Sequence, residues 1–134
     1  MTNEISEWNG YPVYGDVREL DYIAGADSLI NLEKDDIIRV LSADGKNYLT
    51  TSIHTNLGDA FKDALNDLSC NIDNVNSLLI DFRYGNKSPK MSELSPITAS
   101  LSEANPDIDV VWGMSSDETL ADSCKVTLLA SVKA

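Results

Sequence analysis

The most regular hydrophobic pattern in the sequence lies near its middle and predicts a helix between two strands. Apolar residues there repeat at intervals of three and four, the spacing of one helix face: Leu57, Ala60, Phe61, Ala64, Leu65 and Leu68. The preceding segment 48–53 is rich in strand formers, and the following segment 77–82 is a compact apolar strand, expected at the centre of a sheet. This order restricts the chain to folds in which a helix crosses over a sheet.

Further periodic segments extend this alternation on both sides. They predict helices and strands at 35–42 (helix), 92–104 (helix), 108–112 (strand) and 124–132 (strand). Ser95 can cap a shorter form of the second of these helices, with Pro96 at its first position. The short link from Trp112 to Cys124 allows the last two strands to pair antiparallel. The expected fold class is therefore α+β, a two-layer sandwich with a mixed four-stranded sheet and two packing helices.

Residues 1–27 have a different composition and no lasting period. Aromatic residues, among them Trp8, Tyr11 and Tyr14, stand there between glycines and a proline. Dense turn formers predict an irregular arm. Such an arm either packs its aromatic side chains on the main body or exposes them to dock a partner, because exposed Trp and Tyr favour interfaces.

The charge of the chain excludes two classes of partner. The 134 residues include 10 Lys and Arg against 22 Asp and Glu, a formal net charge of −12. This charge disfavours nonspecific binding to nucleic acid and to anionic lipid, so neither is an expected partner. No apolar run approaches the ~20 residues of a membrane helix, and the first residues are acidic, unlike a signal peptide. We expect a cytoplasmic protein whose two cysteines are reduced.

The sequence contains no recognisable motif for catalysis, phosphate binding or metal coordination. Its seven glycines are spaced too widely for a G-x-G-x-x-G loop, and Asp16 stands where a Walker A loop would carry its lysine. The two cysteines lie 54 residues apart, which is no metal-binding spacing. His54, the only histidine, has no accompanying nucleophile pattern. A non-catalytic domain with no cofactor and no metal is therefore expected.

Two stretches, 29–37 and 110–130, resemble the C-terminal half of FtsZ, the bacterial tubulin homologue and cell-division GTPase. The first resembles the loop and helix that open that half. The second resembles the penultimate strand, the Asp-Glu-x-Leu-x-Asp connection and the Lys/Arg-Val-Thr last strand. The resemblance covers about residues 28–132 and implies an FtsZ C-terminal-like domain at 28–134, preceded by the arm at 1–27 and lacking the GTP-binding half.

The resemblance also implies a site and a partner. In filaments of the family, the loop that opens this half enters the nucleotide pocket of the next subunit and helps to position the attacking water. The matching positions are Asn31, Glu33 and Asp36, although Glu33 is one methylene longer than the usual Asp. The implied partner is FtsZ or a related filament-forming GTPase, whose filament end the chain would cap or whose GTP hydrolysis it would stimulate in trans.

Three other interpretations stay open at this point. Asn31 and Asp36 can simply shape the turn and complement the helix N-terminus. The domain can be a small-molecule-binding or enzymatic one that reuses the fold, with sites at an oligomer interface, in which case His54, Arg83, Tyr84 and Lys87 are the residues of interest. A homo-oligomer with a structural role, formed through the arm, is the third.

Overall fold

The computed structural model describes residues 5–24, 28–30, 34–42, 45–68, 72–86 and 89–133. Its strands are β1 (Ile5–Trp8), β2 (Tyr11–Tyr14), β3 (Ser28–Ile30), β4 (Gly45–His54), β5 (Val75–Tyr84), β6 (Asp109–Ser116) and β7 (Cys124–Lys133). Its helices are α1 (Arg18–Ala24), α2 (Lys34–Leu41), α3 (Leu57–Asp67) and α4 (Met91–Ala104), with 3₁₀ turns at Ile72–Asn74 and Glu118–Leu120. The strands and helices predicted between 35 and 132 are all present.

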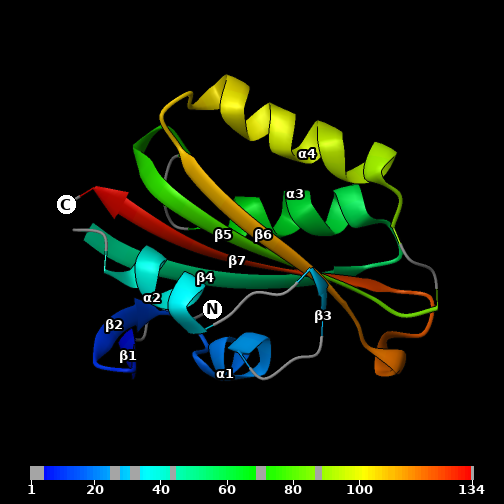
Figure 1. Ribbon diagram of the computed structural model, residues 1–134, viewed down its shortest axis with the longest axis horizontal. Coiled ribbons are helices and arrows are strands. Elements are labelled where there is room, and N and C mark those ends of the chain that lie inside the picture. The colour runs from blue at the N-terminus through cyan, green and yellow to red at the C-terminus, as the bar shows by residue number, and fades with distance from the viewer. Residues whose placement is uncertain are drawn as a thin grey trace.

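The strands form one seven-stranded mixed sheet in the order β1-β2-β4-β7-β5-β6-β3 (Figure 1). β7 pairs antiparallel with both β4 and β5, and β5 pairs parallel with β6 across the α4 crossover. The mixed sheet and the central position of β5 are confirmed, but the antiparallel pairing of the last two strands that the short link allowed is not formed, because β5 lies between them. β7 is buried on both sides through Leu128 and Leu129, so a central position hides more of its apolar surface than an edge would.

One face of the sheet, which we call the first face, is covered by α3 and α4, as Figure 1 shows. The predicted apolar stripe of α3 packs there against alternate residues of the central strands, including Leu78, Ile80, Phe82 and Leu128. α4 begins at Met91 and carries Pro96 in its interior, so it is longer than the capped version that Ser95 suggested. Its first turn is held by Glu93, whose carboxylate accepts the Lys90 backbone N–H at 3.2 Å.

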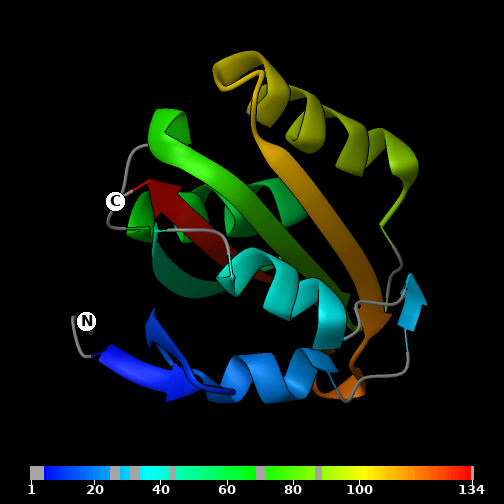
Figure 2. The same ribbon diagram turned by 60° about the vertical axis from the view of Figure 1, so that its left-hand side comes forward.

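The opposite face, the second face, is covered as well, by the β1–β2 hairpin, α1 and α2 (Figure 2). A separate core lies beneath them, formed by Trp8, Val13, Leu20, Ile23, Ile37, Val40, Leu41, Leu49, Leu79 and Leu129. The expected two-layer sandwich with four strands is therefore incomplete. The sheet has seven strands and helices on both sides, because the N-terminal residues and α2 supply a second cover.

The difference lies mainly in residues 5–24, which form a hairpin and a helix rather than an irregular arm. Asn9 and Gly10 connect β1 to β2 with φ values of 52° and 88°. An Asn-Gly pair with two positive φ angles is the favoured two-residue turn of a β-hairpin. The sequence prediction overlooked this signal because the glycines and the proline around it suggested loop structure.

Candidate functional site

The predicted partner-contacting loop leads into α2, and the structure describes the helical part of it. Asn31 and Glu33 lie outside the described residues, whereas Asp36 lies in the first turn of α2, half-buried, next to the exposed Asp35. Both carboxylates complement the positive end of the helix dipole. Their position at the start of a helix is therefore described, while the geometry of the three predicted residues relative to one another is not.

The sheet holds α2 in a fixed position. Its buried side chains Ile37, Val40 and Leu41 pack on the second face. On its exposed side, Arg39 donates to Asp109 at the start of β6, with 2.5 Å between Nη2 and Oδ2. This pair is mostly exposed and adds little stability, so the apolar contacts fix the helix. A rigid helix start is what an acidic side chain needs to orient a water molecule.

The aromatic residues expected to dock a partner lie on or in the second core. Trp8 is 7 % exposed, and its indole Nε1–H donates to Asp21 Oδ1 at 2.8 Å. Tyr11 packs against the same core, and the ring of Tyr14 stacks on that of Tyr48 with centroids 5.2 Å apart. Burial of Trp8 agrees with the alternative in which the N-terminal residues pack their aromatic side chains on the main body, and contradicts the one in which Trp8 is exposed to dock a partner. The exposed large aromatic side chain of this region is Tyr22, at 45 %.

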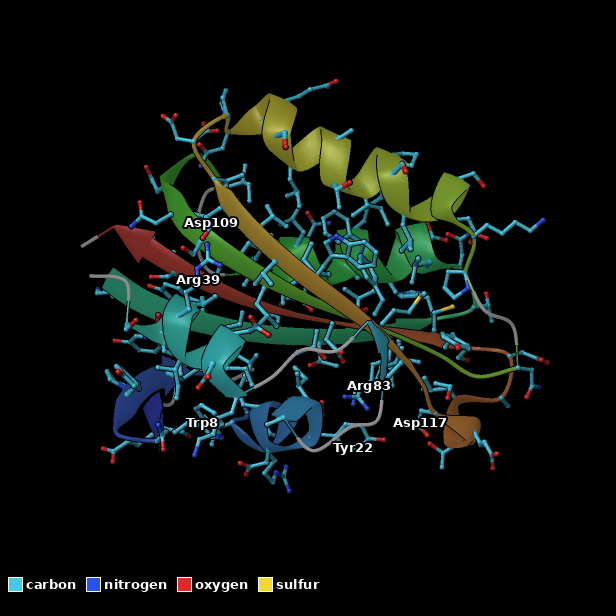
Figure 3. All side chains as sticks on the ribbon, in the orientation of Figure 1. Trp8, Tyr22, Arg39, Arg83, Asp109 and Asp117 are labelled. Atoms are coloured by element: carbon cyan, nitrogen blue, oxygen red, sulfur yellow. The ribbon has the colours of Figure 1, made fainter. Side chains whose placement is uncertain are left out.

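A polar cluster that the sequence prediction missed lies on the second face beneath α1 (Figure 3). We call it the Arg83 cluster, and it consists of Glu19, Tyr22, Asp81, Arg83, Asp117 and Lys125. Arg83 Nε lies 2.6 Å from Asp81 Oδ2, and both side chains are nearly fully buried. The Tyr22 ring covers the guanidinium at 3.9 Å, and Arg83 Nη2 also donates to the Tyr22 carbonyl at 3.3 Å.

The same cluster ties α1 to β7 and to the connection after β6. Lys125 Nζ lies 2.8 Å from Glu19 Oε2 and 5.1 Å from the centre of the Tyr22 ring. The Tyr22 hydroxyl donates to Asp117 at 2.6 Å. Alternation in β5 could have revealed the Asp81–Arg83 pair alone, because these residues stand two apart in an apolar strand and so share a face.

Burial and hydrogen bonding shift the pKa values within this cluster in opposite directions. Desolvation raises the pKa of Asp81, and the neighbouring Arg83 offsets part of that rise. Hydrogen bonds from Thr119 and Tyr22 lower the pKa of Asp117. The same bond to Asp117 raises the pKa of Tyr22. Every charged member of the cluster has a partner, so the arrangement is that of a structural network rather than an exposed catalytic centre.

Of the residues named for a ligand-binding alternative, His54 and Tyr84 flank Cys124 in one row of the sheet, whereas Arg83 belongs to the neighbouring row on the other face. His54 forms a hydrogen bond to Asp63 of α3, Arg83 is enclosed in its cluster, and Lys87 lies outside the described residues. Tyr84 packs partly buried against the first-face core.

An open pocket of about 490 Å³ lies where α3 and α4 begin. It is lined by Thr55, Asn56, Leu57, Pro89, Lys90, Glu93, Asp122, Ser123 and Cys124. Partial burial, together with the charge of Glu93, raises the pKa of the Cys124 thiol, which therefore stays protonated near neutral pH. The described segments contain no group of three or more His, Cys, Asp or Glu side chains arranged to hold a metal ion. Of the helices described, none has both the length and the apolar character needed to cross a membrane.

Comparison with solved structures defines the class of fold. FtsZ from M. jannaschii superposes on 86 % of this chain with a TM-score of 0.71 and 24 % sequence identity. CetZ from Methanosaeta thermophila covers 88 % with a TM-score of 0.66 and 15 % identity, and TubZ from Bacillus thuringiensis serovar israelensis, solved as GDP-form protofilaments, covers 88 % with 0.62 and 13 %. The predicted tubulin/FtsZ C-terminal-domain-like fold is confirmed.

The match covers only part of each of these solved structures. The chain spans only about a third of each of these structures, 35 % in all three cases. No family model matches the sequence, and no curated protein matches it. This chain therefore shares with FtsZ, TubZ and CetZ the fold of one α+β unit, which makes up about a third of each of those structures.

Proposed function

We propose that the chain is a non-catalytic interaction domain that binds FtsZ or a related filament-forming GTPase and changes its assembly or its GTP hydrolysis. The observation that carries this proposal is the superposition of 86 % of this chain on 35 % of an FtsZ chain. A unit with that fold has a surface that can replace one subunit at a filament end.

The contact is assigned to the loop and first turn before α2. Asp36 sits at the start of a helix that is anchored by three buried side chains, so its carboxylate is held at a defined place on the surface. Together with Asn31 and Glu33, it would enter the partner's nucleotide pocket and orient the water that attacks the terminal phosphate. A partner with an open nucleotide-binding end is therefore required, and the chain alone should not turn over GTP.

The test measures GTP turnover and sedimentation of purified FtsZ with and without this protein. We expect altered turnover or shorter polymers at equal concentrations of the two proteins. The Asp36→Asn variant keeps the size of the side chain but removes its charge and replaces one acceptor oxygen by an NH2 donor, and the effect on turnover should fall roughly tenfold.

A matched variant separates this site from a general change in charge. Asp67→Asn alters an exposed carboxylate at the end of α3 by the same one charge and should behave as the unaltered protein. Wild-type FtsZ behaviour at a roughly tenfold excess of this chain would overturn the proposed partner. An effect that survives Asp36→Asn and Asn31→Ala would instead reject the proposed loop.

A further inference from the structure

The outer edge of β4 is open along half its length. β4 pairs with β7 over ten consecutive residue pairs, from Gly45↔Lys133 to His54↔Cys124, without a register shift. On its other side the register with β2 contains a single pair, Tyr14↔Tyr48. Within the described part of the chain, no strand pairs with the outer side of residues 50–54. These residues therefore present backbone N–H and C=O groups in the arrangement that another strand requires.

Gly15 explains why the hairpin stops covering this edge. Its φ is 146°, and a Cβ atom at this position would lie 2.5 Å from the Leu49 carbonyl oxygen. Only glycine fits so close to the strand in this conformation. The chain crosses β4 at Leu49 and continues into α1 beneath the second face. The hairpin leaves the outer side of residues 50–54 unpaired because the chain leaves the edge of β4 at Gly15.

The open edge lacks the features with which proteins usually protect exposed strands. Residues 47–58 contain no Asp, Glu, Lys or Arg, and this is the longest uncharged run in a chain with 32 charged residues. The segment also contains no proline. Its Ile53 side chain is 53 % exposed. An uncharged edge rich in β-branched residues favours pairing with a further strand, whereas edge lysines and prolines would oppose it.

We propose that two copies of this chain associate through antiparallel pairing of their β4 edges, so that the two sheets form one continuous sheet. A symmetric pair centred on Ser52 places Thr51 opposite Ile53 and Thr50 opposite His54 of the second copy. An antiparallel strand is complementary to itself under two-fold symmetry, and Thr–Ile cross-strand contacts between β-branched side chains are favourable. This interface uses β4, not the hairpin aromatic residues named earlier, of which Trp8 is buried.

Charge repulsion between two copies is smallest where they meet through the uncharged edge of β4. Each copy carries −12, so two copies repel each other wherever their charged surfaces meet. Contact through the longest uncharged segment brings few carboxylates into the interface; Asp63, which is hydrogen-bonded to His54, lies beside its end. Salt screens the remaining repulsion over a Debye length of about 8–10 Å. Dimerisation through this edge should therefore strengthen as the NaCl concentration rises, unlike association driven by attraction between opposite charges.

The first experiment is analytical ultracentrifugation of the full chain at protein concentrations up to about 1 mM. We expect a concentration-dependent rise from the monomer mass of 14.6 kDa towards twice that value. Ile53→Lys places a charge on the edge and, by symmetry, one on each copy, which should weaken dimerisation about tenfold or more. Ser102→Lys adds the same charge on the exposed side of α4 and should leave it unchanged. A monomer throughout, or equal effects of both variants, would overturn the proposal.

A second experiment tests the register independently of affinity. Opposite Cα atoms in antiparallel strands are about 4.5–5.5 Å apart, within reach of a disulfide. Ser52→Cys should therefore form a disulfide between the two introduced cysteines under mild oxidation, identified by peptide mass mapping. Ser102→Cys serves as the control and should not cross-link. Circular dichroism verifies that each variant is folded. Equal cross-linking of both variants would contradict pairing at Ser52.

Discussion

The two faces of the sheet differ in polarity. The first face, under α3 and α4, is apolar along the whole length of the central strands, as the side chains of Leu78, Ile80 and Phe82 show. The second face changes along those strands. One row across the sheet is Leu49, Leu129 and Leu79, the next contains Thr51, Thr127 and Asp81, and the third contains Ile53, Lys125 and Arg83.

Because of this difference, the elements that cover the two faces have different roles. The apolar first face needs only the amphipathic stripes of two helices, which bury carbon surface without directional constraint. The polar rows of the second face need specific partners, and α1 supplies them through Glu19 and Tyr22. We conclude that the first face carries the larger apolar core, whereas the polar groups of the second face fix where α1 and the connection after β6 must lie.

Truncation of the first-face core should produce the largest effect. Phe82 is fully buried, and its ring contacts that of Trp112 edge-on with centroids 5.9 Å apart. Phe82→Ala should lower the free energy of unfolding by roughly 3–5 kcal/mol, since it removes a large side chain and leaves a cavity. Urea denaturation followed by circular dichroism measures this change. A loss below about 1 kcal/mol would mean that the core relaxes to fill the space.

Breaking the buried ion pair should produce the next largest effect. Arg83→Met leaves the Asp81 carboxylate buried without its partner and should cost about 3 kcal/mol at neutral pH. The double variant Asp81→Leu with Arg83→Met removes both charges and should recover most of that loss. Equal instability of the single and double variants would show that the pair does not act as a unit.

The pH dependence of the Arg83→Met variant tests the direction in which its stability changes with pH. Burial already raises the pKa of Asp81, and loss of Arg83 removes the main influence that lowers it. A carboxyl whose folded-state pKa exceeds its unfolded-state pKa is stabilising below the unfolded value, and this contribution is lost as pH rises through the folded value. The variant should therefore regain stability relative to the unaltered protein as the solution is acidified.

The sequence predicts the first face better than the second for a physical reason. The α3 stripe and the apolar strand 77–82 repeat with the periods of a helix and of a buried strand, so both were identified correctly. The hairpin at Asn9 and Gly10 depends on one two-residue turn, a local signal that neighbouring turn formers obscured. Seven strands instead of four follow from that turn and from short pairings that have no period.

The candidate site divides in the same way. Asp36 could be placed at a helix start because Asp35 and Asp36 precede an apolar helical pattern. The Arg83 cluster could not be predicted from the sequence, because its members come from distant segments. Glu19 and Lys125, for example, are more than a hundred residues apart in the chain. Only the tertiary fold brings α1 over β5 and β7, and no local sequence pattern predicts a contact between segments so far apart in the chain.

The smallest predicted effect concerns the exposed end of the Arg83 cluster. Hydrogen bonds from Thr119 and Tyr22 lower the pKa of Asp117 in the folded protein. Such a carboxylate stabilises the fold above its unfolded-state pKa, and the contribution is lost as pH falls through the folded-state pKa. Between about pH 6 and about pH 2, the unaltered protein should therefore lose more stability than Asp117→Asn does. Urea denaturation at several pH values measures the difference. Identical pH profiles for Asp117→Asn and the unaltered protein would mean that the Tyr22–Asp117 contact does not hold α1 in solution.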